Sequence, residues 1–348
     1  MKAAIIGHER YPIAAPFAGG LESFTWHLAK GLRRRGHEIV LYAAPGSDPE
    51  LCAEELQVET VELSGAARAD LSMSPEQHVV ATIAYLQVMR SLAARDDIDI
   101  IHNNSLHYLP IALAATVPQP VLTTLHTPPH PWIEPALRLT PSVRTIAVST
   151  AVANAWSHVT AADVVHNGVD LDAWRPGPGG TDLVWSGRIV PEKAPHLAVR
   201  IARLAGRGIR LAGPIADPEY FRDVLAPLLD ENVTHVGHLR HPELGDLVRS
   251  SAACIVSPVW DEPFGLVAAE AMACGTPVLA LARGGLSEIV QPPGGVSVAP
   301  EAREADMRAA LECVMALDRS GVRRYAEQHF SIDAMVDRYC TIYDELLA

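Results

Sequence analysis

The sequence predicts an α/β protein made of two similar domains, each built on a parallel sheet. The length of 348 residues suggests two domains at about 150 residues each. Apolar strands alternate with amphipathic helices along the chain, which is typical of parallel sheets. A Pro- and Gly-rich stretch at 175–180 separates two such series. We expect the two domains to leave a cleft that the carboxyl ends of their strands face.

The first series begins with the short apolar run 3–6, which is typical of a buried parallel strand. A glycine-containing loop follows, and apolar residues then recur at helical spacing over 21–32 until Gly36 ends the helix. Further strands are expected at 38–42, 98–101, 121–125 and 145–148, the last followed by a helix from Ser149. We therefore assign residues 1–170 to the first domain.

The second series begins with the strand 183–187, and a helix is expected after Pro195. Further strands are predicted at 210–212, 253–256 and 278–281, and a helix at 264–274. Behind Ser331, a plausible helix cap, an apolar stripe over 332–346 predicts a final helix. We assign 171–328 to the second domain and 329–348 to a separate C-terminal helix.

Composition excludes several classes of protein. The net charge of −13 argues against general nucleic-acid binding, although a small basic site for phosphate is compatible with it. The five cysteines are scattered and never form CxxC, which argues against a disulfide framework or a zinc site. The N-terminal apolar run is too short for a signal peptide, and no window reaches the 18 or more apolar residues of a membrane span. We expect a cytoplasmic protein.

Glu262 and Glu270, with seven residues between them, are the strongest chemical signal. Glu262 lies in the loop after a strand, and Glu270 lies about one and a half turns inside the following helix. The free N–H groups at this helix start form an anion site, and Gly265 lets backbone approach a phosphate closely. One carboxylate would then lie beside a phosphate and the other would reach hydroxyl groups, although ordinary helix starts also favour acidic residues.

Arg188 and Lys193 form a second candidate site at the end of the strand 183–187. Arginine can hold a diphosphate as a two-pronged fork and lysine as a point charge. The alternative is that both are solvated surface charges.

Gly19-Gly20, at the start of the first helix, resembles a backbone cradle for phosphate, although a plain loop would look the same. No GxGxxG follows the first strand and no GxxxxGK[ST] occurs, which argues against a dinucleotide dehydrogenase and a P-loop enzyme. His126 directly follows the strand 121–125, so it would point into the cleft and hydrogen-bond a ligand. Because the chain has 15 histidines, a structural role is the alternative.

Two other patterns are interpreted as structural. The DxD triplets at 97–99 and 170–172 match a metal-binding signature, but the first leads into a strand and the second belongs to a turn. Lys30 and the arginines 33–35 could dock on a membrane. Cations are favoured at a helix C-terminus in any case. We predict no metal site, and peripheral membrane contact remains an alternative that we do not favour.

Taken in order along the chain, these motifs resemble the family-four glycosyltransferases of the GT-B fold. The most specific part is the segment 254–290, with Glu262-x7-Glu270, the sequence AMACGTP at 271–277, Gly284-Gly285 and Glu288. The other matching features are Gly19-Gly20, His126, the turn 167–170, and Gly187-Arg188 with Lys193. The resemblance implies the GT-B fold, in which two Rossmann-like domains have parallel sheets that face a central cleft.

The resemblance also implies roles for individual residues. Arg188 and Lys193 would bind the donor diphosphate. Glu270 would hydrogen-bond the ribose, and Glu262 would bind hydroxyls of the donor sugar. His126 would contact that sugar near the reacting carbon.

Backbone groups would contribute to donor binding as well. The amides that would touch phosphate are those of Gly265, Leu266 and Gly20, with Gly19 beside them. Gly237 and His238 match a loop that lies against the base. The final helix would cross back onto the first domain.

The implied activity is that of a retaining hexosyltransferase, which moves a sugar from a UDP-, GDP-, ADP- or dTDP-sugar to a hydroxyl of an unknown acceptor without metal or cofactor. Residues 8–18, 64–80 and 126–137 are expected to shape the acceptor pocket. A sugar-nucleotide 2-epimerase shares the fold but needs acid/base carboxylates in the first domain. A non-catalytic nucleotide-sugar binder would be expected to lose the charged site residues, and none is lost here.

Overall fold

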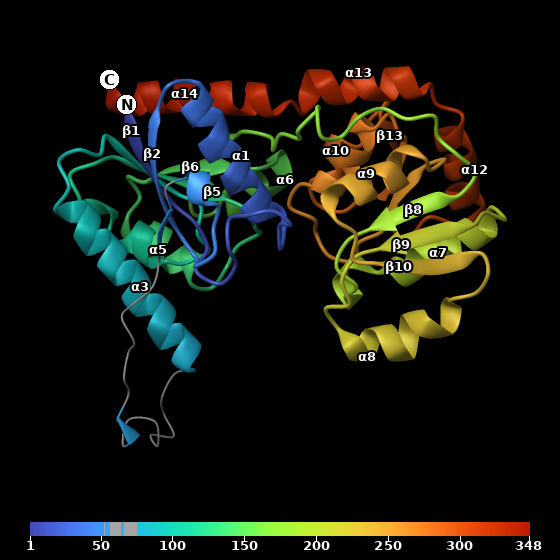
Figure 1. Cartoon of the computed structure of the whole chain (residues 1–348), viewed down its shortest axis with the longest axis horizontal. Helices are drawn as coiled ribbons and strands as arrows, with labels where there is room; N and C mark the ends of the chain where they lie inside the picture. The colour runs from blue at the N-terminus through green and yellow to red at the C-terminus, as the bar shows by residue number, and fades with distance from the viewer. Residues whose placement is uncertain (52, 56–63, 66–74) are drawn as a thin grey trace. The chain divides into compact units, whose positions relative to one another are not determined.

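The computed structural model describes residues 1–51, 53–55, 64–65 and 75–348 (Figure 1). Cys52 and residues 66–74 of the expected acceptor segment 64–80 lie outside this range. The chain divides into two compact units, each of which holds its own parallel sheet. The first unit comprises Met1–Val148, Val152–Val165 and Val336–Ala348, and the second comprises Ser149–Ala151 and His166–Met335. The predicted α/β class with two parallel sheets is confirmed.

The first sheet has seven parallel strands in the order β3-β2-β1-β4-β5-β6-β7. Its central strands are almost completely buried, as expected where helices cover both faces. The strand order reverses between β1 and β4, so the carboxyl ends of these two strands mark the place where such sheets bind ligands. The strands are β1 (Lys2–Ile6), β2 (Glu38–Ala43), β3 (Ala53–Glu55), β4 (Ile100–Asn103), β5 (Val121–Leu125), β6 (Arg144–Ala147) and β7 (Asp163–Val164).

Helices cover both faces of this sheet, with α1 and α14 on one side and α3 and α5 on the other (Figure 1). Helix α1 packs closely on α14, since a Cβ atom on Gly31 would lie 2.5 Å from Val336. Arg35 and Asp337 form an ion pair of 2.6 Å at the same contact. The helices are α1 (Gly20–Arg34), α3 (Glu76–Ala93), α4 (Leu109–Ala112), α5 (Ile133–Leu139), α6 (Thr150–Trp156) and α14 (Ile332–Leu347).

A buried polar network joins α14 to the first sheet. His102 Nδ1 lies 2.6 Å from the Tyr343 hydroxyl, and His102 Nε2 lies 2.7 Å from Thr124 Oγ1. Thr124 Oγ1 is in turn 3.1 Å from the Tyr339 hydroxyl. All four side chains are buried, and a fully bonded network of this kind fixes one packing arrangement. The last residues of the chain therefore complete the core of the first unit.

The second sheet has six parallel strands in the order β10-β9-β8-β11-β12-β13. Its apolar core lies between the strands and the helices α7 and α12, with Leu183, Ile201, Leu211 and Val314 among the buried residues. The strands are β8 (Leu183–Ser186), β9 (Ile209–Ala212), β10 (Val233–Gly237), β11 (Cys254–Val256), β12 (Val278–Leu281) and β13 (Gly295–Val298). The helices are α7 (Pro195–Leu204), α8 (Pro218–Tyr220), α9 (His241–Arg249), α10 (Leu266–Ala273), α11 (Leu286–Ile289), α12 (Glu304–Met315) and α13 (Arg319–His329).

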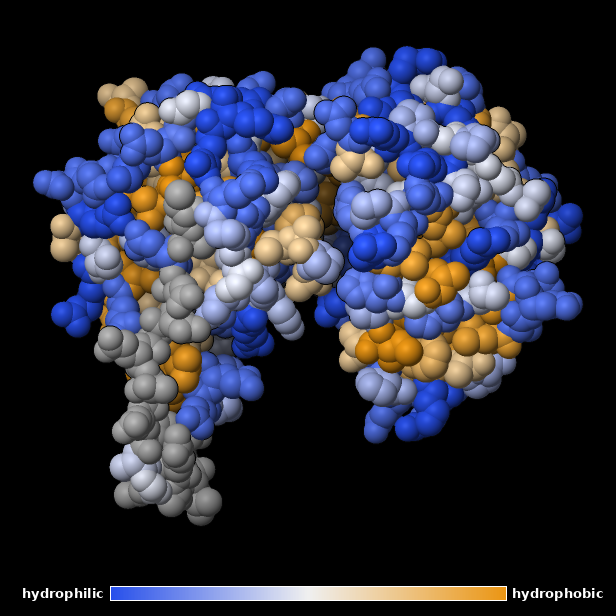
Figure 2. Space-filling model, in the orientation of Figure 1, coloured by the Kyte–Doolittle hydropathy of each residue, from blue (hydrophilic) through white to orange (hydrophobic). Residues whose placement is uncertain are grey.

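The visible surface is mostly hydrophilic, with separate apolar patches (Figure 2). The basic cluster near the end of α1 is partly neutralised by acidic neighbours. Lys30 Nζ lies 3.1 Å from Glu50 and 3.7 Å from Asp48, and it also sits 4.2 Å above the Trp26 ring. Within the described ranges, no helix is both long and apolar enough to span a bilayer.

Candidate active site

Three glycines line the carboxyl end of the second sheet. Gly187 and Gly213 follow β8 and β9, and Gly237 ends β10; all three have positive φ angles, of 153°, 147° and 84°. A Cβ atom on Gly213 would lie 1.8 Å from the carbonyl oxygen of Gly187. Only glycine allows the loops to approach this closely. The result is a row of bare backbone beside the residues that the sequence singled out.

Arg188 and Lys193 lie in the loop between β8 and α7. The Arg188 side chain is 53% exposed, and its ion pair with Glu192 spans 3.9 Å. Lys193 ends a short 3₁₀ turn, and the next residue, Ala194, has a left-handed φ of 44°. A non-glycine residue in this region carries backbone strain, which persists where surrounding contacts impose it. The Ala194 carbonyl oxygen accepts a hydrogen bond of 3.0 Å from the Ser257 hydroxyl.

Glu262 contacts Lys193 directly, which the sequence did not predict. Lys193 Nζ lies 2.5 Å from Glu262 Oε2, and the indole N–H of Trp260 donates to the same oxygen over 3.0 Å. Lys193 also lies 4.9 Å above the Trp260 ring. The lysine is therefore held over the site by a carboxylate and an indole. Trp260 was missed because only the fold shows that its N–H is directed at Glu262.

Glycines also form the start of α10. Gly265 has a φ of 99°, and the helix begins at Leu266, within two residues of the expected start at about 264. A Cβ atom on Gly284 would lie 2.3 Å from the Glu262 carbonyl oxygen, which also accepts a hydrogen bond of 2.7 Å from the Gly285 N–H. The glycine pair thus supports the loop that carries Glu262. The first N–H groups of α10 have no intrahelical partner and can face an anion.

Glu270, on α10, differs from Glu262 in its surroundings. Its carboxyl has no hydrogen-bond or ion-pair partner among the described residues. Burial raises the pKa of Glu270 to about 7. The nearby thiols of Cys254 and Cys274 are neutral, because burial raises the pKa of each to about 12. A half-buried carboxyl without a partner is available to a ligand hydroxyl.

His126, in the first unit, directly follows β5 and is half-buried. Its Nε2 lies 3.1 Å from Asn104 Oδ1, and the Phe24 ring meets it edge-on at 4.8 Å between centroids. Burial lowers the pKa of His126 to about 3, so the ring is neutral. The Asn104 amide nitrogen is buried without a partner among the described residues. Among the described residues, the Asn104 amide is therefore an unused hydrogen-bond donor beside His126.

Gly19 and Gly20 stand where α1 begins. Gly19 is the residue before the helix and has an extended φ of −168°, which any residue can adopt. A larger residue would be crowded at this position, since a Cβ atom would lie 3.2 Å from the Glu22 carboxylate. Gly20 is the first residue of α1 and places its N–H at the positive end of the helix.

His238 follows β10 and Gly237 in the loop that leads to α9. The structure therefore places the loop 236–239 beside the row of glycines at the carboxyl edge of the second sheet. The candidate residues fall into two groups: His126, Gly19 and Gly20 in the first unit, and the remaining eight in the second.

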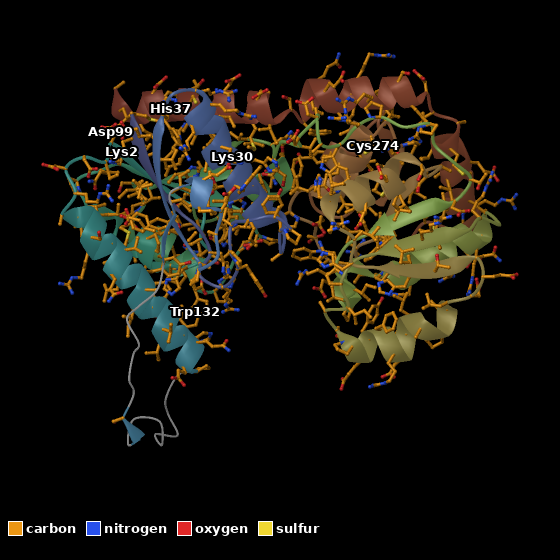
Figure 3. All side chains as sticks on the ribbon, viewed as in Figure 1. Lys2, Lys30, His37, Asp99, Trp132 and Cys274 are labelled. Carbon is orange, nitrogen blue, oxygen red and sulfur yellow. The ribbon has the colours of Figure 1, made fainter. Side chains whose placement is uncertain are left out.

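The two DxD triplets have structural partners. Asp99 accepts a hydrogen bond of 2.6 Å from the Lys2 backbone (Figure 3), and Asp97 pairs with Arg95 at 2.9 Å. Asp170 Oδ1 accepts from two backbone N–H groups of its own turn. In the part of the chain that the structure describes, no group of three or more His, Cys, Asp or Glu residues could hold a metal ion.

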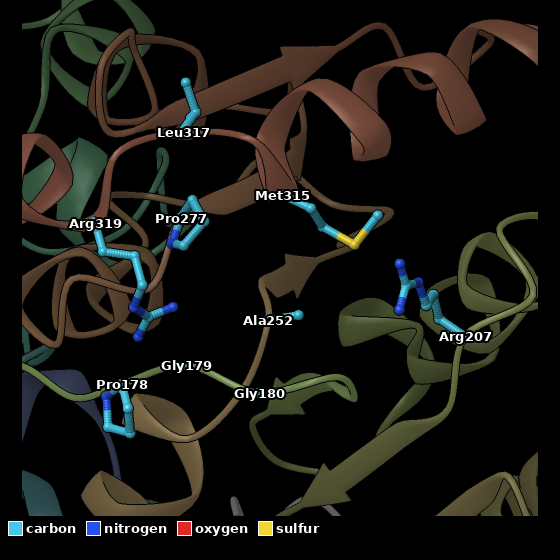
Figure 4. A pocket seen from close by; sticks show the side chains of 9 residues that line it. All are labelled: Pro178, Gly179, Gly180, Arg207, Ala252, Pro277, Met315, Leu317 and Arg319. Carbon is cyan, nitrogen blue, oxygen red and sulfur yellow. The ribbon is translucent and has the colours of Figure 1, made fainter.

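A pocket of about 250 Å³ lies at the opposite, amino end of the second sheet (Figure 4). Its lining comes from residues that precede the strands, including Gly180, Ala252 and Pro277. Arg319 is its prominent cation, but the guanidinium donates to three backbone carbonyls and to the Thr276 hydroxyl. We interpret Arg319 as a structural residue that joins loops.

Two family models match nearly all of the chain. The model described as Glycosyltransferase Family 4 matches residues 18–173, and the model described as Glycosyl transferases group 1 matches residues 174–328. The D-inositol 3-phosphate glycosyltransferase of Mycolicibacterium paratuberculosis is 30% identical over 341 residues, which cover 83% of this chain and 76% of that protein. The protein of the same name from Mycobacteroides abscessus is 33% identical over 208 residues, covering 53% of this chain but only 47% of the relative.

Solved structures share the fold over almost the whole chain. AviGT4, a glycosyltransferase involved in avilamycin A biosynthesis, is 23% identical with a TM-score of 0.72 and covers 99% of this chain and 98% of its own. HepE of Anabaena in complex with UDP is 18% identical with a TM-score of 0.77, covering 99% and 100%. At these identities the likeness establishes the fold, so the expected GT-B architecture is confirmed. Together with the two family models and the M. paratuberculosis relative, it shows that the chain belongs to the group 1 glycosyltransferases of family 4.

Proposed function

We propose that the protein is a retaining glycosyltransferase that moves a sugar from a nucleoside-diphosphate sugar to an acceptor hydroxyl without a metal ion. The observation that carries this proposal is the grouping of Arg188, Lys193 and the start of α10 at the carboxyl end of the second sheet. Two cations and a helix N-terminus match the charge of a diphosphate. HepE, which has the same fold, was solved with UDP bound, so UDP-sugars are the first donors to test.

In the proposed reaction, the bond between the sugar C1 and the diphosphate oxygen breaks, and its electron pair goes to that oxygen. Arg188, Lys193 and the amides of Gly265 and Leu266 stabilise the growing negative charge, which is the task of a metal ion in other enzymes. The acceptor oxygen forms a bond to C1 on the same face of the sugar. Its proton passes to the leaving phosphate.

Retention by attack on one face fits the surroundings of Glu262. A double displacement would need a free carboxylate as nucleophile. Glu262 is engaged by Lys193 and by the Trp260 N–H, both of which draw on the same oxygen. We assign Glu262 to hydroxyls of the donor sugar instead, and Lys193 is shared between Glu262 and the diphosphate when donor binds.

The remaining donor contacts are assigned as the family resemblance implies. Glu270, whose carboxyl has no partner among the described residues, binds the ribose. His126 contacts the donor sugar, and Gly20 contacts phosphate. Gly237 and His238 lie against the base.

The test is a screen of the full chain with UDP-, GDP-, ADP- and dTDP-sugars, first by thermal shift and then by release of nucleoside diphosphate with and without EDTA. Binding to the native state raises the unfolding midpoint by mass action. We expect one donor to be turned over equally well in chelator, and NMR of the product to show the anomeric configuration of the donor.

Each rival outcome is distinct in the same experiment. An inverted product would contradict retention, and activity lost in EDTA but restored by a divalent ion would contradict metal independence. Conversion of the donor sugar into its 2-epimer would identify an epimerase. Donor binding without turnover would identify a non-catalytic binder.

A further inference from the structure

Four stacked rings in the first unit run from a buried tyrosine to an exposed tryptophan. The ring centroids are 4.5 Å apart for Tyr85 and His107, 4.6 Å for His107 and Tyr108, and 5.8 Å for Tyr108 and Trp132. Tyr85 is completely buried, whereas Trp132 is 55% exposed. We call these four residues the ring column.

The ring column is assembled from segments that are far apart in the sequence. Tyr85 comes from α3, His107 and Tyr108 follow β4, and Trp132 follows β5 just before α5. Figure 3 shows Trp132 close to α3. Residues that follow β4 and β5 leave the sheet at its carboxyl edge, where His126 also lies. In parallel α/β sheets this edge is where ligands bind.

A carboxylate lies at the inner end of the ring column. The Tyr85 hydroxyl is 2.9 Å from Glu9 Oε2 and 3.0 Å from the Gly7 carbonyl oxygen. The ring of His8 lies 3.3 Å from the same carboxylate. Arg10, the next residue, is 55% exposed and directs its Nε to the other Glu9 oxygen at 3.3 Å. Arg10, the cation that the described residues place at this end, is therefore paired with an acid.

The imidazoles along the ring column add hydrogen-bonding groups. The Leu109 N–H donates to His107 Nδ1 over 3.3 Å, which leaves the His107 proton on Nε2. Burial lowers the pKa of His107 to about 4, so this ring is neutral at physiological pH. His78 meets Trp132 edge-on at 6.2 Å between centroids. Within the described residues, neither cation–π contact involves a ring of the column.

An exposed indole backed by stacked rings offers a flat apolar surface with polar groups beside it. Burying such a surface is favourable, and aromatic side chains with a few convergent polar groups are typical of small-molecule sites. A sugar or cyclitol ring has the matching shape: C–H bonds on its face and hydroxyls around its rim. A phosphate site would have arginine or lysine. Among the described residues no such cation lies over these four rings, and Arg10 at the inner end is paired with Glu9.

We propose that the ring column is the acceptor subsite and that it binds a polyhydroxylated ring without a phosphate or other anionic group, that is, a neutral sugar or cyclitol. The face of this ring stacks on the exposed Trp132, and its hydroxyls bond to the polar groups beside the column. The proposal rests on the proposed glycosyl transfer, and it adds the class of acceptor.

The first measurement needs no turnover. Saturation-transfer NMR is recorded on the full chain with methyl α-glucoside and myo-inositol, and in parallel with glucose 6-phosphate and inositol 3-phosphate. We expect transfer to the face C–H protons of a neutral compound and little to the phosphates. Trp132→Ala should abolish the signal. Leu139→Ala is the matched control, because Leu139 is 71% exposed at the other end of α5.

The second measurement uses nucleoside diphosphate release from the accepted donor. Neutral rings should stimulate release at least about ten-fold more than their phosphates. Trp132→Ala should raise the acceptor KM about ten-fold while donor KM and acceptor-independent hydrolysis stay unchanged, and Trp132→Phe should restore most of the affinity. This pattern separates a binding role from a folding defect, which would lower all rates together.

Three results would overturn the inference: preference for the phosphorylated compounds, an unchanged acceptor KM in Trp132→Ala, or no NMR signal from any neutral ring. Each leaves the proposed function intact if donor hydrolysis continues. Conversely, if no donor is hydrolysed but neutral rings still bind at Trp132, the glycosyl transfer is wrong while the sugar subsite stands.

Discussion

The two ends of the second sheet hold arginines in opposite situations. At the amino end, Arg319 donates to the carbonyl oxygens of Gly177, Ser251 and Arg249 and to Thr276. At the carboxyl end, Arg188 is 53% exposed and has one ion pair of 3.9 Å among the described residues. The pocket of about 250 Å³ is at the Arg319 end. This pocket is therefore at the end of the sheet opposite to the candidate site.

The difference teaches that a hollow and a set of incompletely bonded polar groups need not lie at the same end of a sheet. A cation with all its donors engaged holds loops together, whereas a cation with free donors remains available to a ligand. Glu270, unpartnered among the described residues, fits the same criterion at the carboxyl end. We expect substitutions at the carboxyl end to lower activity and substitutions at the amino end to lower stability.

The largest effect is expected at the carboxyl end. Arg188→Ala and Lys193→Ala should each lower turnover about 10²–10³-fold, because leaving-group charge is larger in the transition state than in the bound donor. Arg188→Lys should recover only part of the lost turnover, since an ammonium group cannot bind two phosphate oxygens as a guanidinium does. Stability in urea should hardly change. Arg200→Ala, which breaks a surface pair with Glu304, is the control; near-wild-type turnover in both site variants would contradict the proposed role.

Arg319→Ala should lower stability and leave turnover unchanged, the reverse of the carboxyl-end variants. We expect the free energy of unfolding to fall by about 2–4 kcal/mol, because several carbonyl oxygens lose a charged donor. Turnover per folded molecule should remain normal. Arg324→Ala, on the same helix, removes a surface pair of 3.6 Å with Asp318 and should cost less than about 0.5 kcal/mol. A large loss of kcat in folded Arg319→Ala would mean that the amino end takes part in activity.

Gly284→Ala should reduce both the free energy of unfolding and the turnover, because its Cβ atom would lie 2.3 Å from the Glu262 carbonyl oxygen. The matched control is Gly206→Ala, which has a φ of 61° but nothing within 4 Å. The control isolates the cost of a left-handed alanine, about 1 kcal/mol. Gly284→Ala should cost about 2 kcal/mol more and slow donor turnover. Equal unfolding free energies for the two variants would show that the clash is relieved without moving Glu262.

Glu270 should make stability depend on pH. Its folded pKa of about 7 is above the usual 4.5, so the folded state binds a proton that the unfolded state has released. The free energy of unfolding should therefore fall as pH rises from about 4.5 to about 7, and then level off. Glu270→Gln should flatten this profile by up to about 3 kcal/mol in urea titrations, whereas the surface change Glu312→Gln should not. A wild-type profile that is flat over this range would contradict the raised pKa.

Much of the fold could be predicted from the sequence, because buried parallel strands appear as short apolar runs. The strands β1, β5, β8 and β12 lie within one or two residues of their predicted positions. The edge strand β10 was missed, since its sequence VTHVG has few apolar residues and was interpreted as a loop. Helix α3 was missed because exposed Val80 and Leu86 obscure the apolar face formed by its buried residues.

The candidate site was predictable where it depends on local motifs. Gly265 and Glu270 stand near one helix start, so their proximity follows from sequence spacing. The pair of Lys193 and Glu262 could not be foreseen, because 69 positions separate them and only the packing of two loops joins them. The ring column is likewise a product of topology, since β4, β5 and α3 each supply part of it.

The position of α14 has a consequence for how the protein is made. Residues 336–348 belong to the first unit, yet they are synthesised after all of the second unit. Until then His102 lacks Tyr343, and the face of the sheet that α14 covers stays open. The first unit is thus finished only after the second, and its unfinished apolar face is exposed to chaperones while the second unit is being made.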